Sequence, residues 1–308
     1  MSANALTVDA EGHRITGVST EPGAEDLPLV VALHGGSYTS AYFDVPGHSL
    51  LEAGQTNGFE VIALDRPGYG GSGPLPPGGV TFARNAEVLD AAITKVWETR
   101  GGSRPGIVLI AHSIGAAIAI HIAAGRPAWP LLGIALSGIH DTAPPHVRDA
   151  WASMPPGVPV ELTREQRRMF FYGPDWTIEP DIVERAEVSA APIPLEELLE
   201  VVGEWPQSAS GLAGKVSVPV QYVGVEFEQL WTITPDTVRE FASYFAAAPL
   251  VDSFLMPGIG PRRRPPSGGQ GTSATSAGLR FAMRRGGKAH RGGRGVGVRE
   301  RTSSQRGL

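Results

Sequence analysis

A strand-like run passes through a single serine into a helix-like run in the segment Leu109-Ile110-Ala111-His112-Ser113-Ile114-Gly115-Ala116-Ala117. The run before Ser113 is continuously apolar, as in a buried strand, and residues 114–124 are almost wholly apolar, as in a buried helix. The small residues at 111, 115 and 116 allow a strand and a helix to approach closely. We therefore expect Ser113 on a sharp, strained turn at the carboxyl edge of a sheet, above the N–H groups of the following helix.

Short apolar runs alternate with helical periodicity over the first 260 residues. Six of these runs predict buried strands, at 28–33, 59–64, 106–111, 132–137, 218–223 and 250–255. Apolar residues at three- and four-residue spacing predict a helix over 82–96. Another helix is expected to begin at Thr234-Pro235-Asp236, where the threonine would cap it. This order predicts an α/β fold with a doubly wound, mostly parallel sheet.

Residues 140–215 interrupt the alternation and are rich in proline, acidic side chains and large apolar side chains. An insertion of this length between two strands is expected to form a small helical lid. Its aromatic residues would pack the lid on the core, or line an apolar pocket, or do both. We therefore predict a core of 1–139 and 216–260, a lid of 140–215, and a disordered basic tail of 261–308.

The composition limits the chemistry. The chain has 308 residues, 42% of them hydrophobic, and no cysteine, which excludes disulfides, thiol nucleophiles and Cys-based metal sites. No apolar run approaches the roughly 18 residues of a membrane span. The first residues lack the pattern of a signal peptide, so we expect a cytoplasmic protein with no membrane partner. No motif calls for a cofactor or a metal.

The net charge of −5 combines two unlike parts. After Gly260 there are twelve basic residues and one acid, Glu300, which gives +11. Residues 1–260 carry 14 basic and 30 acidic residues, which gives −16. The composition therefore changes at the position where the strand and helix pattern ends.

The turn at Ser113 resembles the nucleophile elbow of the α/β-hydrolase superfamily, with Ala111 where the first glycine of G-x-S-x-G usually stands. His34-Gly35-Gly36-Ser37 resembles the oxyanion loop of that family. The resemblance implies that the backbone N–H groups of Gly36 and Ile114 stabilise a developing oxyanion. The segment from Asp65 to Ser72 resembles the family's structural turn D-x-x-G-x-G-x-S. A Rossmann-type nucleotide binder would instead need a glycine-rich turn leading directly from the first strand into a helix.

The resemblance also implies a triad in the chain order Ser, acid, His. Gly224-Val225-Glu226-Phe227-Glu228 resembles the family's acid turn, G-E-x-D, with Val225 in the place of the glycine. This alignment assigns Glu228 as the acid and leaves Glu226 as the second choice. Asp141, after the strand at 132–137, is a third candidate because some family members carry their acid there.

The triad histidine is missing at its expected position. Met256-Pro257-Gly258-Ile259-Gly260 resembles the lead-in to that histidine, but the next residue is Pro261. His290 lies far into the tail, and His140 at the end of a neighbouring strand would be a rare substitute. We expect His112 to point away from the Ser113 hydroxyl and His34 to order the oxyanion loop.

The break in motif and the break in composition coincide, which suggests one event, a frameshift in the coding DNA. Arginine, glycine, proline, serine and alanine are what GC-rich codons give out of frame. Losing the first base of a proline codon CCN before CGN leaves CNC, which includes the histidine codon CAC. Residues 261–308 are therefore interpreted as a candidate frameshift product.

The sequence thus predicts a serine hydrolase that acts on a carboxylic ester or thioester through an acyl-enzyme at Ser113, impaired by the missing histidine. The alternative is a pseudo-hydrolase that binds a small apolar ligand under the lid. A second alternative is nucleic-acid binding through the Arg-Gly-Gly runs of the tail. That alternative is disfavoured because Phe281 is the tail's one aromatic residue, so base stacking would be weak.

Overall fold

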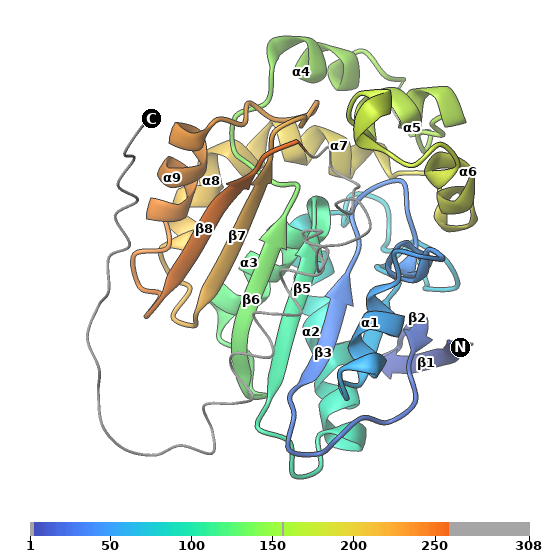
Figure 1. The fold of residues 1–308 in the computed structure, drawn as a ribbon, viewed down its shortest axis with the longest axis vertical. Coiled ribbons are helices and arrows are strands. Elements are labelled where there is room, and N and C mark those ends of the chain that lie inside the picture. Colours follow the sequence, from blue (N-terminus) through green and yellow to red (C-terminus); the bar gives the residue numbers. More distant parts are fainter. Residues whose placement is uncertain (1–2, 156, 259–308) are drawn as a thin grey trace, which may run out of the picture.

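The computed structural model describes residues 3–155 and 157–258, which form an eight-stranded sheet covered by helices (Figure 1). The strand order is β1-β2-β4-β3-β5-β6-β7-β8. β1 and β2 run antiparallel to each other and β2 runs antiparallel to β4, whereas the other neighbours are parallel. The prediction of a doubly wound, mostly parallel α/β fold is confirmed. The predicted tail, 261–308, lies outside the described residues.

The strands are β1 (Asn4–Ala10), β2 (His13–Ser19), β3 (Leu29–Leu33), β4 (Val61–Leu64), β5 (Ile107–His112), β6 (Leu131–Ser137), β7 (Val220–Val225) and β8 (Val251–Met256). The helices are α1 (Leu50–Thr56), α2 (Phe82–Arg100), α3 (Ile114–Gly125), α4 (Pro145–Ala152), α5 (Arg164–Phe171), α6 (Ile182–Ala186), α7 (Leu195–Val202), α8 (Glu204–Ala213) and α9 (Pro235–Ser243). Short 3-10 turns occur at Ser40–Asp44, Asp175–Thr177 and Glu187–Ser189.

The two faces of the sheet have separate cores because alternate side chains of a strand point to opposite faces. On one face, Val31 and Leu109 pack with residues of α2, α3, α8 and α9. On the other face, Val30 and Ile110 pack with α1 and with the turn Ser40–Asp44. Figure 1 shows α1 in front of the sheet and α2 and α3 behind it. Every residue of β3 and β4 is buried, as expected for parallel strands covered on both faces.

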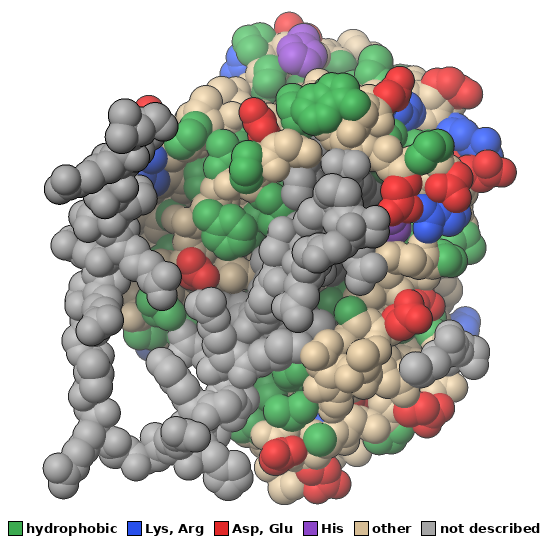
Figure 2. Space-filling model, in the orientation of Figure 1, with side chains coloured by type: hydrophobic (Ala, Val, Ile, Leu, Met, Phe, Trp, Pro, Cys, Tyr) green, Lys and Arg blue, Asp and Glu red, His purple; other side chains and the backbone are tan. Residues whose placement is uncertain are grey.

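The segment predicted as a lid, 140–215, has two parts. Helices α4 to α7 lie beyond the carboxyl ends of the strands, at the top of Figure 1. Trp151, Leu162 and Leu198 belong to an apolar cluster of this part. Figure 2 shows acidic and basic side chains interleaved over α5 and α6, in agreement with ion pairs such as Arg167–Glu187. The second part, α8, packs against α3, and Trp205 of α8 is buried in the main core. None of the described helices is both long and apolar enough to cross a membrane.

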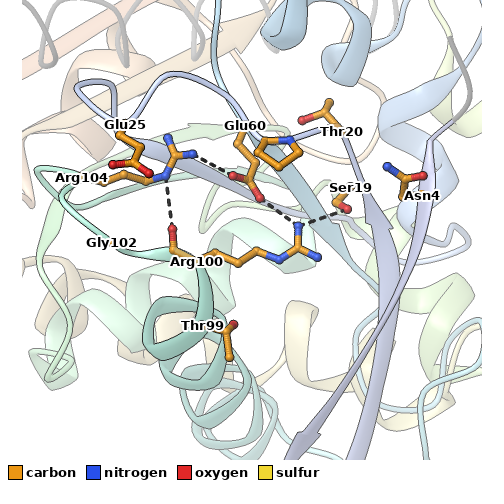
Figure 3. A pocket seen from close by; sticks show the side chains of 10 residues that line it. Asn4, Ser19, Thr20, Glu25, Glu60, Thr99, Arg100, Gly102 and Arg104 are labelled. Carbon is orange, nitrogen blue, oxygen red and sulfur yellow. Dashed lines mark hydrogen bonds and ion pairs between the residues drawn. The ribbon is translucent and has the colours of Figure 1, made fainter.

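An ion-pair cluster lies at the opposite end of the sheet, where the parallel strands begin, and lines the pocket in Figure 3. Glu60, which is 2% exposed, immediately precedes β4. Its carboxylate accepts one hydrogen bond from Arg100 and one from Arg104, each at 2.8 Å. Arg104 also donates to the carbonyls of Ala24 and Leu27, at 2.7 and 3.3 Å. The cluster therefore holds the loop before β3 against the end of α2.

The first turn of α3 packs on the end of β3 with no space for a side chain at Gly115. A Cβ there would lie 2.5 Å from the carbonyl oxygens of both Leu33 and His34. These are backbone atoms that cannot move aside cheaply. Gly125, at the other end of the same helix, has nothing within 4 Å of the equivalent position.

We predict that Gly115→Ala lowers the free energy of unfolding by about 2–3 kcal/mol, because it overpacks the contact between α3 and β3. Gly125→Ala is the matched control and should raise the free energy of unfolding by about 0.5 kcal/mol through helix propensity. Urea unfolding of both variants measures the difference. A loss in Gly115→Ala no larger than the change in Gly125→Ala would contradict the packing argument.

Candidate active site

Ser113 stands on the turn between β5 and α3 in a strained backbone conformation, with φ 54° and ψ −128°. A positive φ is uncommon for a residue other than glycine and persists only where the surroundings enforce it. The Ser113 N–H donates to Ser137 O at 2.8 Å, and the Ser113 carbonyl accepts from Ala116 N at 2.7 Å. The Ser113 side chain makes no capping hydrogen bond to α3. The hydroxyl is therefore displayed at the carboxyl edge of the sheet, as the sequence predicted.

The loop after β3 lies directly against Ser113. A Cβ on Gly35 would come within 2.7 Å of Ser113 Cβ, and one on Gly36 would come within 3.3 Å of Ile114 Cδ1. Ile114 is the first residue of α3, so its N–H has no partner within the helix. The N-terminus of a helix also favours negative charge. Ser113, Gly36 and Ile114 thus surround one space, as a group that stabilises an oxyanion would.

His34 orders this loop as a neutral imidazole. Its Nε2 accepts a hydrogen bond from the Arg66 N–H at 3.1 Å, so the ring proton lies on Nδ1 and is donated to Gly35 O at 2.7 Å. His34 is fully buried. Burial and the nearby charge of Arg66 hold the pKa of His34 well below its usual value. The imidazole is therefore committed to the loop and does not reach Ser113.

The turn that follows β4 is structural. Asp65 accepts hydrogen bonds from Ser40 N at 2.7 Å and from Thr16 Oγ1 at 2.6 Å. Gly70 has φ 55°, and a Cβ there would lie 2.4 Å from Asp65 Oδ2. The Ser72 hydroxyl donates to Asp65 O at 2.8 Å and accepts from Thr16 N at 2.9 Å. The turn thus ties β4 to β2 and to the segment after the oxyanion loop.

An apolar cavity opens between Ser113 and helices α4, α5 and α7. Its wall combines residues of the loop, the elbow, α4, α5, α7 and the turn after β7, namely Gly36, Ser113, Ile114, Val147, Trp151, Phe171, Leu198, Val201, Val202, Leu230 and Trp231. Two aromatic residues of the segment predicted as a lid, Trp151 and Phe171, line this cavity. The same two residues also belong to the apolar cluster that packs the helices of that segment together. The cavity suits an apolar group attached to a reacting carbonyl.

A second, adjoining cavity brings Ser113 and Glu228 together. Gly36, His112, Gly138 and Phe171 also line it. Glu228 Oε1 accepts hydrogen bonds from the N–H groups of Gln229 and Leu230, both at 3.1 Å. Burial raises the pKa of Glu228 to about 7 despite these two bonds. Glu228 is thus a positioned, desolvated carboxylate at the site.

The other two acid candidates are engaged elsewhere. Glu226 is exposed, and its Oε2 accepts a hydrogen bond from Gly258 N at 2.6 Å. Asp141 accepts a hydrogen bond from the Tyr244 hydroxyl at 2.8 Å and lies 2.8 Å from His140 Nδ1. His140 is 2% exposed, with its Nε2 3.1 Å from Thr237 O. None of these three residues is among those that line the two described cavities.

Of the described histidines, His112 is the one that lines either of these two cavities. Its ring is stacked on Tyr42, with centroids 5.1 Å apart, and its Nδ1 lies 3.1 Å from Ser137 Oγ. Pro261, which stands where the family pattern predicts histidine, lies outside the described residues, as does the remote His290. No cluster of three or more His, Asp or Glu side chains suited to a metal occurs in 3–155 or 157–258.

The sequence analysis missed a buried ion pair below the loop. Arg66 Nη1 and Nη2 donate to Glu197 Oε1 and Oε2 at 2.6 and 2.9 Å, and both side chains are fully buried. The Tyr69 hydroxyl donates to Glu197 Oε2 at 2.7 Å. The partners are 131 and 128 residues apart in sequence, so no local pattern links them.

Comparisons with known proteins agree with this geometry. The model of the alpha/beta hydrolase family matches residues 30–268. The chain therefore belongs to the alpha/beta hydrolase family.

Among curated proteins, protein phosphatase methylesterase 1 from Bos taurus is 31% identical over 138 residues, which is 42% of this chain and 33% of that protein. The Mus musculus protein of the same name is 30% identical over 138 residues, 42% of this chain and 32% of that protein. The matched region thus spans about a third of the length of these relatives.

Among solved structures, a haloalkane dehalogenase loop variant from Bradyrhizobium elkanii has a TM-score of 0.64 at 17% identity, covering 94% of this chain and 100% of that one. A thermophilic esterase from Thermogutta terrifontis has a TM-score of 0.57 at 18% identity, covering 84% of this chain and 91% of that one. The thioesterase domain from the curacin biosynthetic pathway has a TM-score of 0.59 at 15% identity, covering 92% and 100%. At these identities the likeness concerns the fold.

The raised pKa of Glu228 predicts a pH-dependent stability. A carboxyl group whose pKa is 4.5 in the unfolded chain and about 7 in the folded protein stabilises the fold most below pH 4.5, and this contribution is lost as the pH rises through 7. Replacing Glu228 by glutamine removes that loss. When the pH is raised from 5 to 8, wild type should lose about 1–2 kcal/mol more of its free energy of unfolding than Glu228→Gln does.

Urea unfolding at the two pH values measures this difference. The control is Glu226→Gln, which removes the same charge from an exposed position in the same turn and should track wild type. Equal pH dependence of Glu228→Gln and wild type would show that the carboxylate is not desolvated.

Proposed function

We propose that this chain is of serine hydrolase lineage, with a site for carboxylic esters or thioesters that react through an acyl-enzyme at Ser113. The observation that carries the proposal is the elbow itself. Ser113 is held at positive φ with its hydroxyl displayed, beside the loop of Gly36 and the first N–H of α3. A serine in this position favours acyl transfer over the chemistry of family members whose nucleophile is an aspartate.

In the proposed reaction, Ser113 Oγ attacks the carbonyl carbon of the substrate while its proton passes to a general base. The carbonyl oxygen becomes negative and accepts hydrogen bonds from the Gly36 and Ile114 N–H groups. The base gives its proton to the leaving alcohol or thiol as the intermediate collapses to the acyl-enzyme. Water then attacks the acyl-enzyme, its proton passes through the base to Ser113 Oγ, and the acid is released. Glu228 would orient the base and stabilise its charged form.

The expected general base is missing from this chain, because Pro261 stands where the family pattern predicts the triad histidine. Loss of a triad base costs turnover by as much as roughly a millionfold in other hydrolases. We therefore expect slow turnover from the chain as written.

The apolar cavity supports a substrate with an apolar acyl or alcohol part. The curated relatives are named methylesterases, which fits the ester class and extends it to esters of a small alcohol. The thioesterase domain among the structural neighbours shares the fold and leaves thioesters within the class.

A ligand-binding pseudo-hydrolase is the second candidate. The apolar cavity beside Ser113 together with Pro261 favours it, since binding needs the pocket and not the base. Nucleic-acid binding would rest on the tail, which lies outside the described residues. It would be recognised by an affinity that falls steeply with salt.

The dependence on Ser113 can be measured on the full chain with p-nitrophenyl butyrate. After subtraction of the hydrolysis that imidazole catalyses without protein, we expect a slow rate that rises when imidazole is added as an external base, and no such rise in Ser113→Ala. Ser210→Ala, an exposed serine on α8, is the control and should match wild type. Equal rates in Ser113→Ala and wild type, with and without imidazole, would refute the assignment of the nucleophile.

We also propose that residues 261–308 arise from a frameshift. Resequencing the coding DNA from the source across the Gly260 codon tests this directly. We expect one inserted or missing base whose correction gives histidine at 261, and the corrected chain should hydrolyse esters without added imidazole. An unchanged reading frame would refute the frameshift and favour the pseudo-hydrolase, to be tested by ligand binding under the lid.

A further inference from the structure

The Gly35–Gly36 peptide connects the proposed oxyanion donor to a buried charge. The carbonyl of Gly35 and the N–H of Gly36 belong to one planar peptide unit and point in opposite directions. Gly35 O accepts hydrogen bonds from His34 Nδ1 at 2.7 Å and from Arg66 Nη2 at 3.3 Å. Fixing the carbonyl on one side of the unit therefore fixes the direction of the Gly36 N–H on the other.

Arg66 is held in turn by Glu197. The guanidinium and the carboxylate pair through two parallel hydrogen bonds, an arrangement that sets the plane and rotation of the guanidinium. In this orientation Arg66 Nε donates to His34 O at 3.0 Å, so the same side chain supports two successive carbonyls of the loop. The centroid of the Tyr69 ring lies 4.4 Å from the guanidinium carbon, so the ring covers one face of the guanidinium.

The cost of burying this pair indicates that its geometry matters. Two charges removed from water are stabilised only if their remaining hydrogen bonds are satisfied. The donors of Arg66 meet this condition by binding the oxyanion loop. A hydrophobic residue could fill the space of Glu197, but it would leave the guanidinium without its anchor.

We infer that Glu197 is a positioning residue of the oxyanion site: through Arg66 it orients the Gly35–Gly36 peptide so that the Gly36 N–H faces the oxygen that becomes negative. Glu197 lies on α7, and Leu198 and Val201 of the same helix line the apolar cavity. One helix of the lid thus supplies both a wall of the pocket and the support of the oxyanion loop. This inference rests on the proposed function.

α7 contains a matched control. Glu200, one turn further along, accepts a hydrogen bond from Phe82 N at 2.8 Å and so fastens the same helix to the start of α2. Glu200→Gln makes the same chemical change as Glu197→Gln without touching Arg66. An effect of Glu197 that came only from loosening α7 would therefore appear in both variants.

The test uses the full chain labelled with ¹³C-carbonyl and ¹⁵N glycine, in which an HNCO spectrum reports only Gly–Gly peptides. The sequence has seven such pairs, and loss of a peak in Gly36→Ala identifies Gly35–Gly36. We expect this peak to move in Glu197→Gln and to stay in place in Glu200→Gln. The Gly101–Gly102 peak, distant from the site, should stay in place in both. Arg66→Lys keeps the charge opposite Glu197 but loses the fork, and it should also move the Gly35–Gly36 peak.

The kinetic test measures Ser113-dependent hydrolysis in the presence of imidazole. Glu197→Gln should lower kcat at least about tenfold with KM within about twofold, because the lost donor acts on the transition state. Glu200→Gln should leave both constants unchanged. Loss of Ser113 dependence would refute the proposed function alone, since the spectra still test the peptide. A Gly35–Gly36 peak that remains at its wild-type position in both Glu197→Gln and Arg66→Lys would overturn the inference. If Glu197→Gln does not fold, the position of this peak in Arg66→Lys decides.

Discussion

The close contact between the first turn of α3 and the end of β3 is the constraint on which the site depends. Because Gly115 has no side chain, the helix comes close enough for the Leu33 and His34 carbonyls to lie where a Cβ would be. That approach places the strained serine at the start of the helix against Gly35. The end of β3, Ser113 and the loop of Gly35 and Gly36 are therefore fixed relative to one another by backbone packing, before any polar interaction is considered. The polar groups then refine an arrangement that the sheet has already set.

Charge at this site is concentrated in two carboxylates with different partners, the fully buried Glu197 and the half-buried Glu228. Glu197 accepts hydrogen bonds from the Arg66 guanidinium and from the Tyr69 hydroxyl. Glu228 has only backbone N–H groups among the described residues, and its pKa rises accordingly. A cation next to Glu228 would have the opposite effect, because an opposite charge favours the ionised form.

Much of the fold could be predicted because its signals are local. The apolar run before Ser113, the small residues after it and the glycines of the turn after β4 each report on a few neighbouring residues. The N-terminal hairpin was missed although its tight turn at Glu11 and Gly12, with φ 55° and 88°, is of the type that glycine favours. The role of α8 was missed because an amphipathic helix does not reveal which surface it covers. The contact between Arg66 and Glu197 joins segments far apart in sequence, so no periodicity or spacing could disclose it.

Glu197 and Glu200 of α7 limit which part of the segment between β6 and β7 could be exchanged. The segment between β6 and β7 does not form one independent unit. In this chain Glu197 and Glu200 attach its last part to the oxyanion loop and to α2, and α8 completes the main core. The portion that can be replaced without disturbing the reaction centre therefore ends before α7. A graft meant to change substrate preference would carry new sequence from α4 to α6 and retain the native helix that follows.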